Sequence, residues 1–307
     1  MTVQLKLASL QAPLIRYPRF KELHREIQRC QELSRMAGEP QCMALEGVPG
    51  AGKSTLVEDF ARTFPRFETE TGTCVPVFYL ETPSPVTVKG MAATMLERLG
   101  DPAAHRGTLW SMNSRLIGLM QACEVQLAIL DDFHHLIDTE TNRILQKVSD
   151  WLKVLIKETG IPFLVVGIEG KVEQILQTNS QLSRLFAMRE TLQPLSWEMV
   201  PRTNQSFGQF AQYAATSLEL SFTSTCPRLE LLYRLYYATD GVVGNLMNLM
   251  RYAASRAQEE HSPVVELNHL ALAFDKRLAQ HLRGKVNPFV YGTEERFTDP
   301  SLETDNW

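Results

Sequence analysis

The chain has 307 residues, 44% hydrophobic and 21% charged, with a formal net charge of −4 at pH 7. These proportions are ordinary for a folded globular protein, and no apolar run reaches the ~18 residues of a membrane helix, so we predict no membrane partner. The charge excludes a surface that attracts nucleic acid everywhere but allows a local basic stripe.

Five scattered cysteines lack metal-binding spacing, and residues 1–10 lack the pattern of a signal peptide. We therefore expect a reducing, cytoplasmic location. The length predicts a main unit of ~150–200 residues and a smaller second one.

Strands and helices alternate over the first two thirds of the chain. Apolar residues at helical spacing predict helices over 19–37, 88–99, 109–122 and 142–157, with another starting near residue 56. Apolar runs predict strands at 42–45, 75–80, 125–132 and 161–167, and a weaker one near 190–195. This alternation predicts a parallel five-stranded sheet covered by helices on both faces.

After residue 197 the strand signals stop. Helical periodicity over 207–218, 229–238, 242–257 and 267–282 predicts a helical lid. The expected domains are an N-terminal segment and helix (1–40), an α/β core (41–196), the lid (197–283) and a flexible acidic tail (284–307).

A phosphate-binding loop lies between the first strand and the helix that follows it. Its residues are Gly47, Val48, Pro49, Gly50, Ala51, Gly52, Lys53, Ser54 and Thr55. Glycines let backbone N–H groups wrap around phosphate oxygens, and the helix N-terminus adds partial positive charge. Lys53 would reach the β- and γ-phosphates, and Ser54 would ligate Mg²⁺. The loop therefore predicts ATP and Mg²⁺ as cofactors.

Two adjacent carboxylates, Asp131 and Asp132, end the strand predicted at 125–132. At the carboxyl end of a parallel strand Asp131 would face the phosphates and help hold Mg²⁺, while Asp132 would polarise the attacking water. The alternative is that either aspartate caps the helix that follows.

This order of parts resembles AAA+ ATPases, and within them the TniB/TnsC family of ATP-dependent regulators of Tn7-like transposons. The similarity covers residues 13–282 and lies in five segments: Tyr-Pro-Arg at 17–19, Leu-Asp-Asp-Phe-His-His-Leu at 130–136, Val-Val-Gly-Ile-Glu at 165–169, Asn-Ser-Gln-Leu-Ser-Arg-Leu-Phe at 179–186 and Gly-Val-Val-Gly-Asn-Leu at 241–246.

The resemblance implies that Arg184 is an arginine finger, supplied to a neighbouring subunit's nucleotide. Arg189 is the second choice, and a surface arginine capping its helix is the alternative. Asp132 replaces the glutamate that is usual there, which predicts slow hydrolysis. Ile168 and Asn245 stand where sensor residues are expected, so no sensor is assigned.

By position in the family, duplex DNA would meet Lys89, Arg106 and Thr108. A few cations per subunit suffice, because an assembly repeats them along the phosphate backbone. For each residue a solvated side chain is the alternative reading.

We therefore expect an ATPase that forms a homo-oligomer, filament or ring, on duplex DNA and links target-site selection to a transposase in DNA recombination. The resemblance implies transposase subunits and a selector of the TniQ type as partners, and leaves open whether an RNA-guided complex takes part. The alternatives are a P-loop phosphotransferase acting on a small molecule and a nucleotide switch without turnover.

Overall fold

A five-stranded parallel sheet organises the larger part of the molecule in the computed structural model, which describes residues 14–70, 72–83, 87–136, 142–197, 206–223, 225–282 and 284–290. The strands are β1 (Met43–Gly47), β4 (Val77–Glu81), β5 (Leu127–Asp131), β6 (Phe163–Ile168) and β7 (Met188–Thr191), in the spatial order β4-β5-β6-β1-β7. The parallel sheet expected from the sequence is confirmed. Its last strand, β7, ends at Thr191, four residues before the end of the strand predicted near 190–195.

Helices cover the sheet because its strands are apolar on both faces. The helices are α1 (Pro18–Ala37), α2 (Lys53–Arg62), α3 (Val88–Leu99), α4 (Leu109–Ala122), α5 (Asn142–Thr159), α6 (Lys171–Gln177) and α7 (Ser180–Leu185), with a 3-10 turn, η2 (Phe133–Leu136), after β5. Alternate strand residues, among them Ala44, Phe78 and Leu130, pack in one core with α3, α4 and α5. The intervening residues face the opposite side, where α2 contacts β1, β4, β5 and β6.

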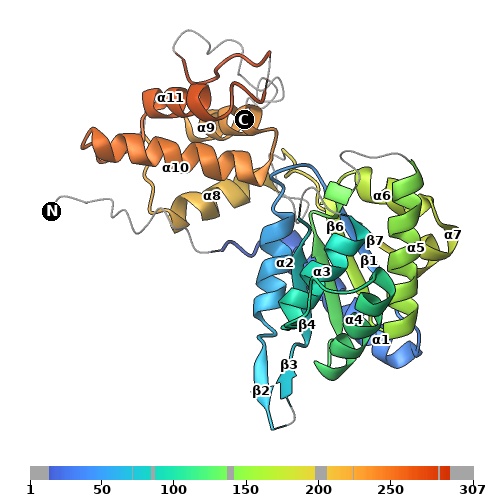
Figure 1. Cartoon of the computed structure of the whole chain (residues 1–307). Helices are drawn as coiled ribbons and strands as arrows, with labels where there is room; N and C mark the ends of the chain where they lie inside the picture. The colour runs from blue at the N-terminus through green and yellow to red at the C-terminus, as the bar shows by residue number, and fades with distance from the viewer. Residues whose placement is uncertain are drawn as a thin grey trace. The chain divides into compact units, whose positions relative to one another are not determined.

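A small hairpin and two short helices of this unit were not expected from the sequence. A hairpin of β2 (Phe67–Thr69) and β3 (Gly72–Cys74) extends away from the sheet between α2 and β4 (Figure 1). The short helices α6 and α7 lie between β6 and β7, where the sequence pattern predicted no helix. Short elements carry few periods of apolar residues, so their pattern in the sequence is weak.

The chain forms two compact units, one spanning Phe20–Gln193 and one formed by the residues on either side of it. Helix α1, expected in a separate N-terminal segment, belongs almost entirely to the first unit. Its Cys30 thiol donates to the Gln41 carbonyl at 2.8 Å, and the Gln31 amide donates to the Gln126 side chain at 3.0 Å.

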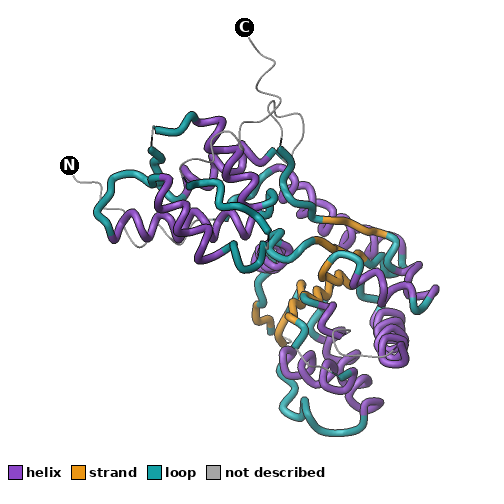
Figure 2. The backbone as a smooth tube through the Cα atoms, turned by 90° about the horizontal axis from the view of Figure 1, so that it is seen from above, coloured by secondary structure: helices purple, strands orange, loops and turns teal. Residues whose placement is uncertain are grey.

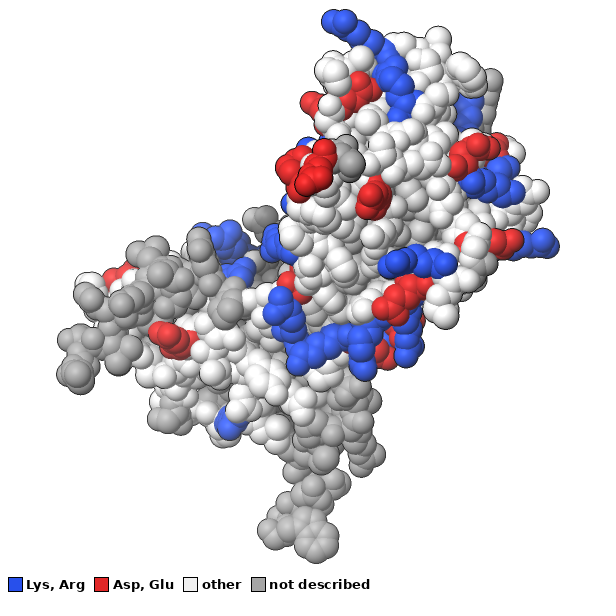
Figure 3. Space-filling view, turned by 90° about the horizontal axis from the view of Figure 1, so that it is seen from below, with Lys and Arg blue, Asp and Glu red and all other residues white. Residues whose placement is uncertain are grey.

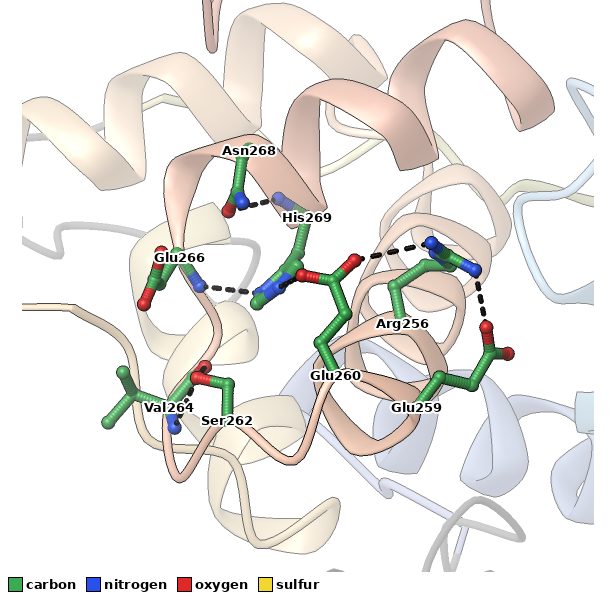
Figure 4. A network of polar contacts seen from close by, with 8 residues as sticks. All are labelled: Arg256, Glu259, Glu260, Ser262, Val264, Glu266, Asn268 and His269. Atoms are coloured by element: carbon green, nitrogen blue, oxygen red, sulfur yellow. Dashed lines mark hydrogen bonds and ion pairs between the residues drawn. The ribbon is translucent and has the colours of Figure 1, made fainter.

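The second unit contains no named strand in its described part (Figures 1 and 2). Its helices are α8 (Phe207–Ser217), α9 (Arg228–Thr239), α10 (Val243–Glu259) and α11 (Leu267–Arg277). The turn between α10 and α11 is held by His269, whose Nδ1 accepts the Glu266 N–H at 3.0 Å and whose Nε2 lies 3.1 Å from Glu260 (Figure 4).

Residues 284–290 pack on these helices, although the sequence pattern placed them in the flexible tail. Phe289 is buried, and the Asn287 amide donates to the Ala271 carbonyl at 2.9 Å. The Arg234 guanidinium also donates to the Pro288 carbonyl. A single buried aromatic and two side-chain hydrogen bonds leave no periodic trace in a polar sequence. Residues 291–307, the rest of the predicted tail, lie outside the described residues.

Candidate nucleotide site

The phosphate loop connects the carboxyl end of β1 to the first turn of α2. Gly50 and Gly52 have φ angles of 78° and 100°, a left-handed conformation that only glycine adopts without strain. Gly47 is required for a different reason, because a Cβ at this position would overlap the Leu192 carbonyl oxygen. The loop can therefore hold its curved backbone with N–H groups available at the helix N-terminus.

Lys53 is the first residue of α2, and only 7% of it is exposed. Its Nζ donates to the carbonyl oxygens of Gly47 at 2.8 Å and Val48 at 3.0 Å. Burial lowers the pKa of Lys53, and the carboxylates of Asp131, Asp132 and Glu46 partly oppose this shift. The ammonium thus lies within the loop, next to the place where an anion would bind.

Asp131 ends β5 and is 1% exposed. The Tyr79 hydroxyl donates to its Oδ2 at 3.2 Å, and the Asp132 N–H donates to its Oδ1 at 2.8 Å. Burial raises the pKa of Asp131, and a hydrogen bond with the Ser54 side chain offsets part of the rise. A buried carboxylate beside a hydroxyl is a donor set of the hard oxygen type that Mg²⁺ prefers, so these two residues fit that ion.

Asp132 is partly buried, and its backbone has a left-handed φ of 48°. This conformation turns the chain away from the strand and into η2, where the His135 N–H donates to the Asp132 carbonyl at 3.0 Å. Nδ1 of His134 lies 3.9 Å from the Asp132 carboxylate, and the rings of His134 and His135 are 4.5 Å apart. The described residues contain no group of three or more metal-ligating side chains, so the paired histidines form no such cluster.

Glu46 is an additional charged residue near the loop that the sequence reading missed. Its Oε1 accepts the Glu173 N–H at 3.0 Å, at the start of α6. Burial raises the pKa of Glu46, and backbone hydrogen bonds from Gly170 and Val172 oppose the rise. Tyr79 was also missed. The signal for Glu46 was its position near the carboxyl end of β1, where parallel sheets carry their sites, and Tyr79 lies within the strand next to β5.

The two candidate arginine fingers have different surroundings. Arg189 is tied into its own unit: it pairs with Glu173, and it donates to the Phe186 carbonyl at 3.1 Å and to the Ser183 hydroxyl at 2.8 Å. Arg184, at the end of α7, is exposed, and no ion pair or hydrogen bond to another described residue involves its side chain. Arg184 therefore keeps its guanidinium available for a group outside the chain.

The expected DNA-contacting residues lie on the surface at α3 and before α4. Lys89 is exposed in the first turn of α3, and Arg106 is exposed before α4. Thr108 has a structural role as well, because its hydroxyl caps α4 by accepting the Ser111 N–H at 3.3 Å. Trp110, 78% exposed in the same turn, was not singled out from the sequence.

Several basic side chains on the surface are paired with acidic ones. On the side of the molecule shown in Figure 3, several Lys and Arg side chains lie next to Asp or Glu side chains. Arg62 pairs with Glu58 at 2.7 Å, and Arg29 pairs with Glu26 at 2.7 Å. Among the described residues, no helix is long and apolar enough to cross a membrane.

The model of the bacterial TniB protein family matches residues 6–196, which include the loop, both aspartates and both arginines. The chain belongs to the TniB family. No curated protein matches it when whole sequences are compared.

Three archaeal structures are similar to this TniB protein in fold. The Aeropyrum pernix ORC1 protein in complex with DNA is 15% identical, with a TM-score of 0.59 over 89% of this chain and 68% of that one. The ORC2 protein of the same organism, in ADPNP–ADP complexes, is 13% identical, with a TM-score of 0.61 over 88% and 70%. Cdc6p from Pyrobaculum aerophilum is 14% identical, with a TM-score of 0.63 over 88% and 71%. The likeness establishes the AAA+ fold, with its helical C-terminal region.

Proposed function

We propose that this TniB protein is an ATP- and Mg²⁺-dependent regulator of transposition, which assembles on duplex DNA and links target-site selection to a transposase. The observation that carries the proposal is the convergence of a buried lysine and a buried carboxylate, Lys53 and Asp131, at one edge of a parallel sheet. Both charges are costly to bury and neither is neutralised in full, which is typical of a site completed by a ligand.

Each residue of the loop edge would have one role. Lys53 would exchange the carbonyl oxygens of Gly47 and Val48 for phosphate oxygens, and Ser54 and Asp131 would hold Mg²⁺. Mg²⁺, when bound, neutralises charge that develops on the transferring phosphoryl group. Asp132 would orient the attacking water, and its short side chain predicts slow hydrolysis.

Arg184 would complete the site of a neighbouring copy. It is supported by its exposure and by the contrast with Arg189, whose side chain is already bound within its own unit. A guanidinium from the next subunit would couple hydrolysis to assembly into a homo-oligomer.

Lys89, Arg106 and Thr108 would contact the duplex, repeated by every subunit of the assembly. Their exposure supports this assignment. The Aeropyrum ORC1 protein was solved in complex with DNA, and its similar fold makes a duplex a reasonable partner for this chain. Transposase subunits and a TniQ-type selector follow from membership of the TniB family.

Electron microscopy of the protein with duplex DNA tests the proposal. With Mg²⁺ and a slowly hydrolysed ATP analogue we expect rings or filaments on the DNA, and with ADP none. Lys53→Ala should weaken nucleotide binding about 100-fold and abolish these assemblies, because it removes a charged hydrogen-bond donor to phosphate.

Lys89→Ala is the matched control, since it removes an exposed lysine outside the loop. It should bind nucleotide normally and lose affinity for DNA only. A protein that stays monomeric on DNA with ATP and Mg²⁺ would contradict the proposal, as would wild-type nucleotide affinity in Lys53→Ala.

A further inference from the structure

Strand β4 is one of the two outer strands of the sheet, and only β5 pairs with it. On the β5 side, the Thr82 N–H donates to the Asp131 carbonyl at 2.8 Å, and the Pro76 carbonyl accepts the Gln126 N–H at 2.9 Å. Because alternate residues of a parallel strand face the same neighbour, the backbone groups of Val77, Tyr79 and Glu81 point away from β5.

These outward backbone groups have no partner in the described part of the chain. No hydrogen bond to another described residue involves the N–H or C=O of Val77, Tyr79 or Glu81. An open edge of this kind is a template for an added strand. Proteins often block such edges with a bulge or a proline, and β4 contains neither between its ends.

A groove follows this edge. Two adjoining cavities, of about 620 and 530 Å³, share Tyr79 and Arg98 and together border β4 from the segment before it to its last residue. The end of α2 and the loop after it form one wall, with apolar surface from Phe64 and Pro65, and Arg98 of α3 belongs to both cavities. The groove therefore offers unpaired backbone groups between two walls.

The charge of the groove changes along its length. The end near Val75 is bordered by Arg62, Arg66, Arg98 and Glu58, where Arg62 pairs with Glu58 at 2.7 Å and Arg66 lies 3.8 Å from Glu68. Near the other end, Glu81 and Glu97 outnumber Arg98. Arg98 is exposed, and no described carboxylate pairs with it. A guanidinium without an acidic partner is well suited to bind a carboxylate of another molecule.

We propose that this groove binds an extended segment of a partner protein, which adds a strand to β4 and places an acidic residue against Arg98. Backbone pairing to the outward groups of β4 would supply affinity, and Arg98 would set the register. A polypeptide is favoured over nucleic acid because the unpaired backbone N–H and C=O groups of β4 match those of another strand. The groove shares Tyr79 with the nucleotide site, but no residue of the phosphate loop lines it.

Fluorescent heptapeptides test this with the full-length protein by anisotropy. The probes are acetylated and amidated, with alternating threonine and valine and two glutamates at one end or the other, and the matched probes carry lysines instead. One acidic probe should bind at least about tenfold more tightly than its lysine counterpart. The same peptide with its central amides N-methylated should lose binding at least about tenfold, because it cannot form the ladder.

Two protein variants locate the binding. Val77→Pro removes one outward N–H at an edge position where proline is tolerated, and should weaken the acidic probe about tenfold, whereas Val77→Thr keeps the N–H and the affinity. Arg98→Glu should weaken it similarly. Lys276→Glu makes the same charge change at an exposed position of α11, which does not line the groove, and should leave binding unchanged. Arg98→Glu alone decides the test if Val77→Pro does not fold.

Four results would overturn the proposal. The first is that no probe saturates at ~1 mM, a concentration that detects even weak binding. The second is that N-methylation leaves the affinity unchanged, which would indicate charge attraction alone. Arg98→Glu could reduce binding of a DNA oligonucleotide while no peptide binds, which would assign the groove to nucleic acid. Self-association that disappears in Val77→Pro would assign the edge to a second copy of this chain.

Discussion

Buried charges are handled in opposite ways in the two units of the molecule. At the candidate nucleotide site, burial moves the pKa values of Lys53 and Asp131 toward the neutral forms. In the helical unit, Arg234 is 2% exposed, but two of its nitrogens contact Glu230, at 2.6 and 2.9 Å, and a third donates to the Pro288 carbonyl. The charges of the nucleotide site are therefore only partly compensated, whereas the Arg234 guanidinium has a partner for each of its three nitrogens.

The turn between α10 and α11 follows the second pattern (Figure 4). The hydrogen bond between Glu260 and His269 holds the pKa of Glu260 below its usual value, and Arg256 contributes further. Paired charges of this kind stabilise the folded chain, whereas unpaired buried charges oppose folding until a ligand arrives. The comparison therefore distinguishes charges kept for structure from charges kept for a ligand, and three substitutions test it.

The largest effect is expected at Arg184. Arg184→Ala should lower the ATP hydrolysis rate of the assembled protein about 10³-fold, because an arginine finger stabilises charge only in the transition state. Thermal stability should be unchanged, since the side chain has no partner among the described residues. Hydrolysis is measured on duplex DNA at saturating ATP.

Arg189→Ala is the control for this prediction. It breaks the contacts with Glu173 and Ser183, so the midpoint of thermal unfolding should fall and hydrolysis per folded molecule should change little. The opposite result, with catalysis lost in Arg189→Ala and retained in Arg184→Ala, would reverse the assignment of the two arginines.

The second largest effect is expected for the ion pair of Arg234 and Glu230. Arg234→Ala should lower the free energy of unfolding by about 3 kcal/mol, because it leaves Glu230 and the Pro288 carbonyl without their partner. Urea unfolding followed by circular dichroism measures this. Arg228→Ala, near the start of the same helix, removes an exposed arginine bonded to Gln212 and should cost at most ~0.5 kcal/mol. Equal losses in the two variants would contradict the comparison.

The sequence was sufficient for the sheet, its helices and the loop, because these depend on local periodicity and on a motif with a fixed spacing. It gave no indication of the hydrogen bond from Tyr79 to Asp131, which joins residues 52 positions apart through strand register. The different surroundings of Arg184 and Arg189 also required coordinates, because two arginines five residues apart have the same chemistry until their neighbours are known.

The smallest effect, with the opposite sign, is expected at Asp131. Asp131→Asn should raise the free energy of unfolding of the nucleotide-free protein at pH 7 by about 1 kcal/mol, or ~2–4 °C in the midpoint, while abolishing hydrolysis. The folded state raises the pKa of Asp131, so it binds the proton more tightly than the unfolded state does, and ionisation opposes folding.

This gain should be complete at neutral pH and shrink as the pH falls toward the unfolded pKa of ~3.9, where the carboxyl is protonated in both states. Asp132→Asn makes the same chemical change at a partly exposed position and should have a smaller effect on stability. If Asp131→Asn were instead destabilising at pH 7, its hydrogen bonds with Tyr79 and Ser54 would outweigh its burial, and this carboxylate would belong with the satisfied charges of the helical unit.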